Sequence, residues 1–147
     1  MMNAKDYLSQ AKYLDQSINA KIQQLGQLND LATKATAVLS GMPHNPSSSS
    51  TSTMADTVVK IVDLQNEINR DIDTLVDLKT DIMHLVKLAS CREYQTILEK
   101  RYLCFQSWEK IAAAMDYDIR WLYRLHGKAL EEVQELLDAD ETRQLKP

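Results

Sequence analysis

Three basic side chains recur at intervals of four residues in the last third of the chain: Arg120, Arg124 and Lys128. The stretch 119–130 that holds them contains no acidic residue. Side chains four residues apart share one face of an α-helix, so the three would form a basic ridge. Guanidinium groups suit contacts to guanine and phosphate, and the neighbouring Trp121 and Tyr123 could touch thymine methyls or sugars. The spacing therefore indicates a surface for double-stranded DNA, although it also occurs on solvated helix faces.

The ridge is predicted to lie on the longer of two helices joined by a tight turn. Periodicity predicts a short helix over 108–114 with Ser107 as its N-cap, a turn at 115–117 and a long helix over 119–137. A supporting helix over 92–102 precedes them. The inner faces are predicted to hold Trp108, Ile111, Ala112 and Met115, and Leu122, Leu125, Ala129, Val133 and Leu136. This layout is typical of a helix-turn-helix DNA-binding unit, although the same shape also serves protein contacts.

The first 90 residues have a different pattern. Apolar residues recur every three or four positions over 4–40 and again over 54–90, which predicts two helices of equal length. On the first helix, Ile22 is expected to take the seam position in place of Lys21. The seam of the second is predicted at Met54, Val58, Ile61, Ile68, Ile72, Leu75, Ile82, Val86 and Ala89.

Residues 41–53 between these helices are rich in Gly, Pro, Ser and Thr, which predicts a flexible linker. Equal helices joined in this way indicate an antiparallel hairpin, a coiled coil folded back on itself. Further apolar residues widen the face of the second helix: Val62, Leu64, Val76, Leu78 and Leu85. Either a second copy of the chain, giving a four-helix bundle, or the C-terminal domain would cover this extra face.

The composition favours helices and sets several classes of protein aside. Three glycines and three prolines in 147 residues are too few for the turns of a sheet protein. A net charge of −4 argues against a diffuse polyanion binder, so any nucleic-acid surface must be local. No segment approaches the roughly 18 apolar residues of a membrane helix, and the start of the chain does not resemble a secretory leader. We therefore expect a cytoplasmic protein with no membrane partner.

Catalytic and metal chemistry find little support in the sequence. His44, His84 and His126 are scattered, and His126 is expected to help pack the long C-terminal helix. Cys91 and Cys104 form neither a disulfide framework nor a four-ligand metal site, and we expect a pair of buried thiols. No phosphate-binding glycine loop or nucleophile elbow occurs. We expect no enzyme activity, no catalytic residue, no metal and no cofactor.

Three segments of the C-terminal region resemble region 4 of sigma-70-type factors: 97–102, 107–112 and 122–130. In that family an Arg-Tyr pair ends one helix, an aromatic-x-x-Ile-Ala motif forms the next, and an Ala-Leu pair closes the recognition helix. The resemblance implies recognition positions at Ile119, Arg120, Tyr123 and Arg124. Ile119 and Tyr123 depart from the arginine that is usual there, so binding to a minus-35 promoter element is not implied. The sigma regions that bind the minus-10 element and the core polymerase have no counterpart.

Over nearly its full length the chain resembles a family of small prophage-encoded proteins of Gram-positive bacteria, part of which is known as ArpU-like late transcription regulators. The shared segments are Tyr-Leu-x-Gln-Ala-x-x-Leu-Asp at 7–15 and Arg-Leu-His-Gly-x-Ala-Leu at 124–130. This resemblance implies a regulator of phage or prophage transcription.

Together these features predict an all-α protein with a long antiparallel helical hairpin followed by a helix-turn-helix domain. Its segments are a first coiled-coil helix over 1–40, a linker over 41–53, a second coiled-coil helix over 54–90, a sigma region 4-like helix-turn-helix over 91–137 and a charged tail over 138–147. Expected partners are double-stranded DNA, a second copy of the chain and RNA polymerase. The alternative is a structural or adaptor protein that binds RNA polymerase or another phage protein.

Overall fold

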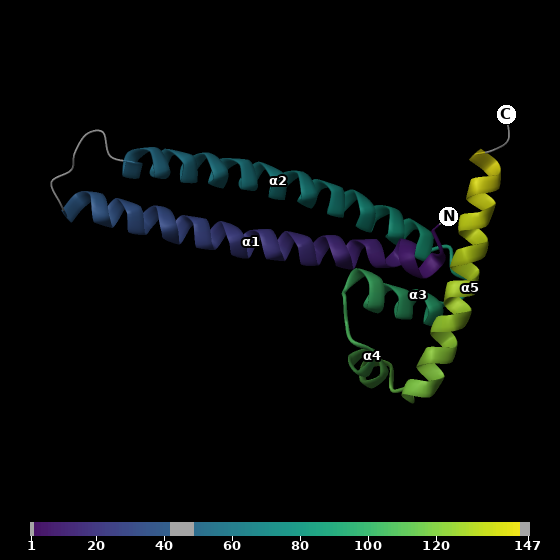
Figure 1. The fold of residues 1–147 in the computed structure, drawn as a ribbon. Coiled ribbons are helices and arrows are strands. Elements are labelled where there is room, and N and C mark those ends of the chain that lie inside the picture. Colours follow the sequence, from purple (N-terminus) through teal and green to yellow (C-terminus); the bar gives the residue numbers. More distant parts are fainter. Residues whose placement is uncertain (1, 42–48, 145–147) are drawn as a thin grey trace. The chain divides into compact units, whose positions relative to one another are not determined.

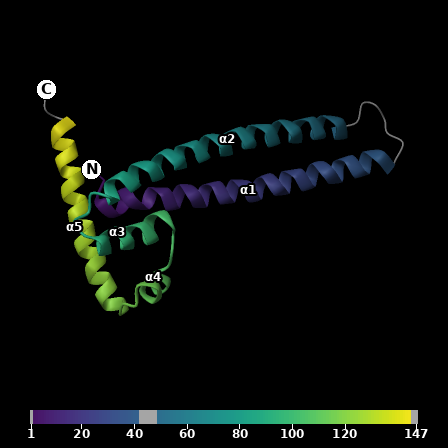
Figure 2. The same cartoon turned by 180° about the vertical axis from the view of Figure 1, so that it is seen from behind.

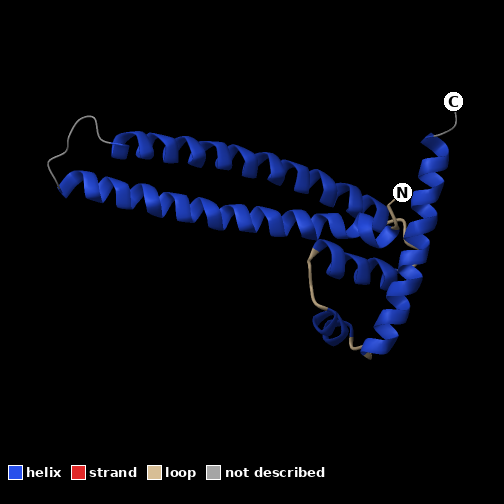
Figure 3. Cartoon of the chain, viewed as in Figure 1, coloured by secondary structure: helices blue, strands red, loops and turns tan. Residues whose placement is uncertain are grey.

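The computed structural model describes residues 2–41 and 49–144, and every regular element in them is helical (Figure 1, Figure 3). The all-α prediction is confirmed. In chain order the elements are α1 (Ala4–Gly41), α2 (Ser49–Val86), α3 (Arg92–Leu98), the π-helical turn η1 (Glu99–Leu103), α4 (Trp108–Met115) and α5 (Ile119–Gln144).

Some helix ends differ from those that the sequence predicts. α2 begins at Ser49, inside the predicted linker, and the linker positions 42–48 lie outside the described residues. α2 ends at Val86 instead of at residue 90, because i to i+3 hydrogen bonds close its last turn; the Ala89 amide donates to the Val86 carbonyl at 3.0 Å. α5 continues through the predicted tail as far as Gln144, and within the tail the Thr142 hydroxyl donates to the Asp138 carbonyl at 2.9 Å.

The chain divides into two compact units, which are described separately. One unit consists of Met1–Leu14 with Leu75–Pro147, and the other of Asp15–Thr74. The first unit therefore includes the start of α1 and the end of α2 in addition to the region predicted as helix-turn-helix.

In the unit Asp15–Thr74, parts of α1 and α2 run side by side in opposite directions (Figure 1, Figure 2). Residues that are at least half-buried recur every three or four positions along both: Ile18, Lys21, Leu25, Leu28, Ala32 and Ala35 on α1, and Met54, Thr57, Ile61, Leu64, Ile68 and Asp71 on α2. Of the residues in this unit whose burial the structure describes, only Ile18 and Ile68 are buried. The contact between the two helices is therefore a narrow seam.

The prediction that Ile22 displaces Lys21 from the seam is wrong. The Lys21 side chain is only 21 % exposed, whereas Ile22 is exposed. Lys21 Nζ lies 3.0 Å from a Glu67 carboxylate oxygen and also pairs with Asp71, both on α2. A lysine can occupy a narrow seam in this way because its aliphatic stem packs while its ammonium reaches carboxylates at the edge.

The predicted seam of α2 is wrong at two further positions. Val58 and Ile72 are exposed, and Thr57 and Asp71 take the positions beside α1. The neighbouring helical stripe lies beside α1 instead, and it carries Asp71, one of the two partners of Lys21. Val58 and Ile72 are left without cover from α1.

The first unit has a core of two clusters. The larger joins the start of α1, the end of α2, the α3–η1 segment and α5: Ala4, Leu8, Ala11, Ile82, Val86, Leu98, Tyr102, Ala129 and Val133. The smaller holds α4 against α3 and α5: Ile97, Ile111, Leu122 and Leu125. Ile97 and Leu98 are adjacent in sequence but belong to different clusters. The helix α3 therefore lies between the two clusters. Each fully buried aliphatic side chain contributes about 1.5–3 kcal/mol to folding.

Candidate nucleic-acid interface

Two capping structures define the turn that separates α4 from α5. The Ser107 hydroxyl accepts a hydrogen bond from the Lys110 amide at 3.3 Å, which confirms the predicted N-cap of α4. α4 ends at Met115, and its C-cap Asp116 adopts the left-handed conformation at φ 58° and ψ 43°. The Tyr117 amide donates to the Ala112 carbonyl at 3.0 Å, as in a Schellman cap. The chain can then enter α5 at Ile119.

Of the five residues predicted for the inner face of α5, four are buried and Leu136 is half-buried. Leu122, Ala129 and Val133 are fully covered and Leu125 nearly so. From α4, Ile111 is buried in the same cluster as Leu122, with Trp108, Ala112 and Met115 packed around it. This packing fixes the rotation of α5 about its own axis, so its opposite face is turned to solvent.

The three residues of the predicted ridge, Arg120, Arg124 and Lys128, are all exposed. None of them forms an ion pair within the part of the chain that the structure describes. Arg120, Trp121 and Arg124 line one shallow hollow together with Asp118. The first half of α5 therefore presents accessible positive charge beside an exposed indole.

The other two predicted contact residues have different surroundings. Tyr123 is exposed, but its ring lies edge-on against Trp108 of α4, with centroids 5.5 Å apart. Ile119 is half-buried at the first position of α5. The structure thus brings Arg120, Trp121 and Arg124 together, while Tyr123 is held by α4.

Arg101 is a cation near this surface that the sequence does not single out. Its guanidinium lies 4.5 Å from the centre of the Trp108 ring, which also lies edge-on against Tyr123 and His126. Arg101 Nη1 also donates to the Gln106 carbonyl at 3.0 Å. The Arg-Tyr pair at the end of the supporting helix was a sequence signal for Arg101. Only the fold shows that the Arg101 side chain reaches α4.

The π-helical turn η1 explains this reach. The Cys104 amide donates to the Glu99 carbonyl at 2.9 Å, a wider turn than that of an α-helix. Phe105 follows with a positive φ of 58°, and Lys79 lies over its ring at 4.6 Å while donating to the Leu103 carbonyl. The loop before α4 is therefore held at both ends by cationic side chains.

A buried polar pair lies behind the basic surface. The Tyr102 hydroxyl and His126 Nε2 are 2.7 Å apart, and Trp108 packs on His126 with ring centroids 4.4 Å apart. Burial raises the pKa of Tyr102 to about 12. Burial, together with the charges of Lys5 and Arg101, lowers the pKa of His126 to about 4. His126 is therefore neutral at pH 7 and packs α5 from within, as predicted.

The cysteines are not the buried thiols that we predicted. Cys91 and Cys104 are both exposed, because each lies just outside a helix end, at the N-cap of α3 and the C-cap of η1. No three His, Cys, Asp or Glu residues among those described are placed to hold a metal ion. None of the described helices is long and apolar enough to cross a membrane.

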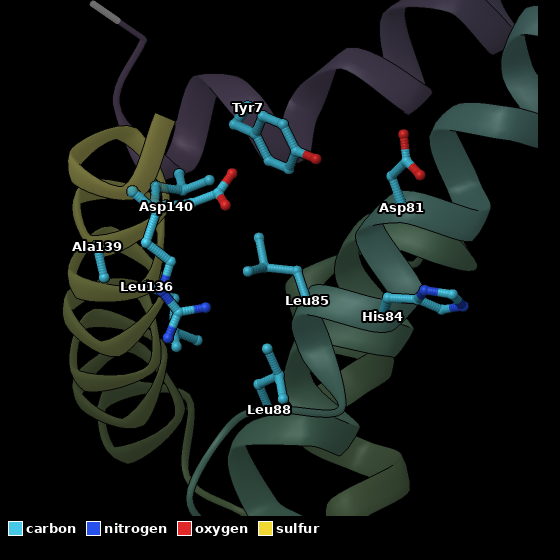
Figure 4. A pocket seen from close by; sticks show the side chains of 10 residues that line it. Tyr7, Asp81, His84, Leu85, Leu88, Leu136, Ala139 and Asp140 are labelled. Carbon is cyan, nitrogen blue, oxygen red and sulfur yellow. The ribbon is translucent and has the colours of Figure 1, made fainter. Parts of the chain in front are cut away.

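A second cavity, of about 530 Å³, lies in the first unit at the other end of α5 (Figure 4). Its apolar lining comes from leucines that include Leu85, Leu88 and Leu136, and its polar lining from Tyr7, Asp81, His84, Asp140 and Arg143. Burial, then the charges of Asp81 and Asp140, raises the pKa of the Tyr7 hydroxyl. The cavity combines apolar groups with two carboxylates, a histidine and an arginine, unlike the basic surface at the start of α5.

No family model, curated protein or solved structure matches this chain.

Proposed function

We propose that α4 and α5 form a helix-turn-helix that binds double-stranded DNA sequence-specifically and regulates transcription of phage or prophage genes. Arg120, Arg124 and Lys128 would contact phosphates and base edges, with Ile119, Trp121 and Tyr123 beside them. The observation that carries the proposal is that all three cations are exposed on one face and have no ion-pair partner among the described residues. Contact with phosphate would therefore break no existing salt bridge.

The placement of charge along α5 supports this proposal. Arg120 stands in the first turn of α5, which contains no acidic residue. A cation there opposes the helix dipole and weakens the isolated helix by a few tenths of a kcal/mol or more. Helix stability therefore gives no reason for an arginine at this position, whereas a bound polyanion does.

The rigidity of α5 also favours sequence-specific contacts. Leu122, Leu125 and Ala129 are buried on the side opposite the ridge, so the outward side chains project from a fixed backbone. Direct readout needs such positioning, because bidentate contacts to base edges depend on angle as well as distance. Asp116 and Asp118 precede the ridge, so we expect the contact to start at Arg120 and to run toward Lys128.

We further propose that the chain self-associates through its two long antiparallel helices. α1 and α2 share only a narrow seam, and several apolar residues of α2 stay exposed beside it, among them Val58, Val62 and Ile72. A second copy would cover them. Two helix-turn-helix units in one assembly would read two half-sites about 34 Å apart or a multiple of that spacing.

A protein-binding adaptor remains the second candidate, because the cavity at the far end of α5 is a specific feature that DNA binding does not use. Leu88 on its edge is exposed, and the acidic Asp81 and Asp140 flank the apolar lining. RNA polymerase or another phage protein with an apolar segment would fit this chemistry.

Selection from a pool of random duplexes, followed by fluorescence anisotropy with the enriched duplex, tests the first candidate. We expect one enriched sequence, and we expect the triple variant Arg120→Ala, Arg124→Ala, Lys128→Ala to bind it much more weakly at the same salt concentration. Arg143→Ala removes one positive charge at the opposite end of α5 and should bind like the wild type. If no duplex binds even at low salt, the adaptor function takes precedence.

A further inference from the structure

One stripe of α2 carries apolar side chains that the seam with α1 leaves uncovered. We call this stripe the α2 face and define it by six positions: Val58, Val62, Gln65, Asn69, Ile72 and Val76. Its four apolar members are between 40 % and 57 % exposed. Intervals of four and three residues place all six on one side of a single helix, about 100° round from the seam.

The α2 face is uncharged although the helix is acidic. Between residues 49 and 86, α2 holds seven acidic and three basic residues; Asp73 and Lys79 border the α2 face on either side, and the other eight lie farther round the helix. A face that only meets water would be expected to share these charges. An uncharged stripe also allows two acidic helices to approach each other without placing like charges at the contact.

Two polar side chains lie at the centre of the α2 face, beside a shallow groove. Gln65 and Asn69 line a shallow groove together with Ile22 of α1. Their side-chain amides have no hydrogen-bond partner within the described part of the chain. An amide carries both donors and an acceptor, so each can pair with an amide from another molecule.

The order of residues on the α2 face reads the same in both directions. Two apolar positions, two amides and two apolar positions follow one another at intervals of four, three, four, three and four residues. A twofold axis perpendicular to the helix, level with Glu67, would place Val62 opposite the partner's Ile72 and Gln65 opposite the partner's Asn69. Val58 would then lie opposite the partner's Val76, and every position would meet one of its own kind.

Parallel pairing of α2 with the α2 of a second copy does not explain the symmetric order of residues. Parallel pairing sets each residue against itself and would need no symmetry in the order of residues. It would also place the like ends of two helix dipoles side by side, which is unfavourable. The symmetric order of the α2 face is therefore evidence for the antiparallel arrangement.

We propose that the α2 face is the dimer interface, formed antiparallel with a second copy of this chain and centred at Glu67, with Gln65 hydrogen-bonded to the partner's Asn69. The apolar positions supply the contact, and the amides fix the register, as single buried polar residues do in coiled coils. The interface specifies the proposed self-association and is independent of DNA binding.

Light scattering across a concentration series tests whether this face holds the dimer. The wild type should approach twice the chain mass, and Val62→Asp and Ile72→Asp should each raise the dissociation constant roughly tenfold or more. Leu31→Asp is the matched control, because Leu31 is an exposed apolar residue of α1 half a turn round from Ile22. Circular dichroism establishes that each variant is folded. A monomer throughout, or a loss of mass only with Leu31→Asp, would overturn the proposal.

Cysteine crosslinking tests the orientation and register. In a Cys91→Ser, Cys104→Ser background, Val62→Cys mixed with Ile72→Cys should form a disulfide-linked dimer, and Val62→Cys alone should not. Linkage of Val62→Cys to itself, or a dimer in light scattering that neither variant links, would contradict the antiparallel interface. Neither experiment contains DNA, so a failure of the DNA-binding proposal would leave both results unchanged.

Discussion

The Tyr102 hydroxyl lies 2.7 Å from His126 Nε2, and the two rings stack at 5.8 Å in the core of the first unit. The bond joins η1, which supports α4, to the N-terminal half of α5, whose outer face carries the basic ridge. Both groups are buried, so losing one partner would leave the other unsatisfied at a cost of about 1–3 kcal/mol. The supporting helix is thereby coupled to α5 through a polar contact as well as through apolar packing.

The stability of the protein should depend on pH through His126. Its pKa is about 4 in the folded chain, against an ordinary value of 6.5, so the unfolded chain binds the proton more readily. The contribution of His126 to the free energy of unfolding is fully present above pH 6.5. It falls by about 3 kcal/mol in all as the pH decreases toward 4. Urea unfolding at constant ionic strength measures the effect. His126→Gln should flatten this part of the pH profile, and a variant profile as steep as that of the wild type would refute the assignment.

Lys21 should matter for the pairing of α1 with α2. Lys21→Glu places a third carboxylate beside Glu67 and Asp71, so thermal denaturation should show a lower Tm. Lys34→Glu makes the same charge change at an exposed position of α1 and should have little effect. Adding Glu67→Lys and Asp71→Lys to Lys21→Glu should restore much of the Tm. Failure of this rescue would mean that the two helices do not meet in the described register.

The negative charge of Asp116 should weaken DNA binding. Replacing this residue with asparagine should therefore strengthen binding and leave the turn intact. Asparagine tolerates the left-handed conformation of this residue as well as aspartate does, so Asp116→Asn should change the free energy of unfolding little. Removing its negative charge next to the ridge should strengthen duplex binding a few-fold at low salt. Asp63→Asn, at an exposed position on α2, serves as the control for net charge. Identical gains for both variants would place the DNA elsewhere.

Periodicity and capping residues were enough to predict much of α4 and α5. Leu122, Leu125 and Ala129 recur at helical spacing and are buried, and Ser107 caps α4 as its position before the apolar run indicated. These features depend on local sequence, so a pattern can reveal them. The exposure of Arg120 and Arg124 follows directly, because they lie opposite the buried face.

Features that depend on contacts distant in sequence were missed. A hydrophobicity pattern assigns Ile22 to the seam, but carboxylates about fifty residues later make Lys21 the better occupant. Leu8 is fully buried because α5 and the end of α2 pack around it, not because of α1 alone. The π-helical turn that joins Arg101 to Trp108 likewise has no local signal in the sequence.

The salt dependence of duplex binding tests the central claim most directly. For the wild type, the logarithm of the binding constant should fall linearly with the logarithm of salt concentration. Arg124→Ala should reduce that slope by about 0.9 if the residue meets one phosphate, and adding Arg120→Ala and Lys128→Ala should reduce it further. Arg143→Ala should leave the slope unchanged. A slope that is the same for the wild type and the triple variant would show that the ridge on α5 does not contact DNA.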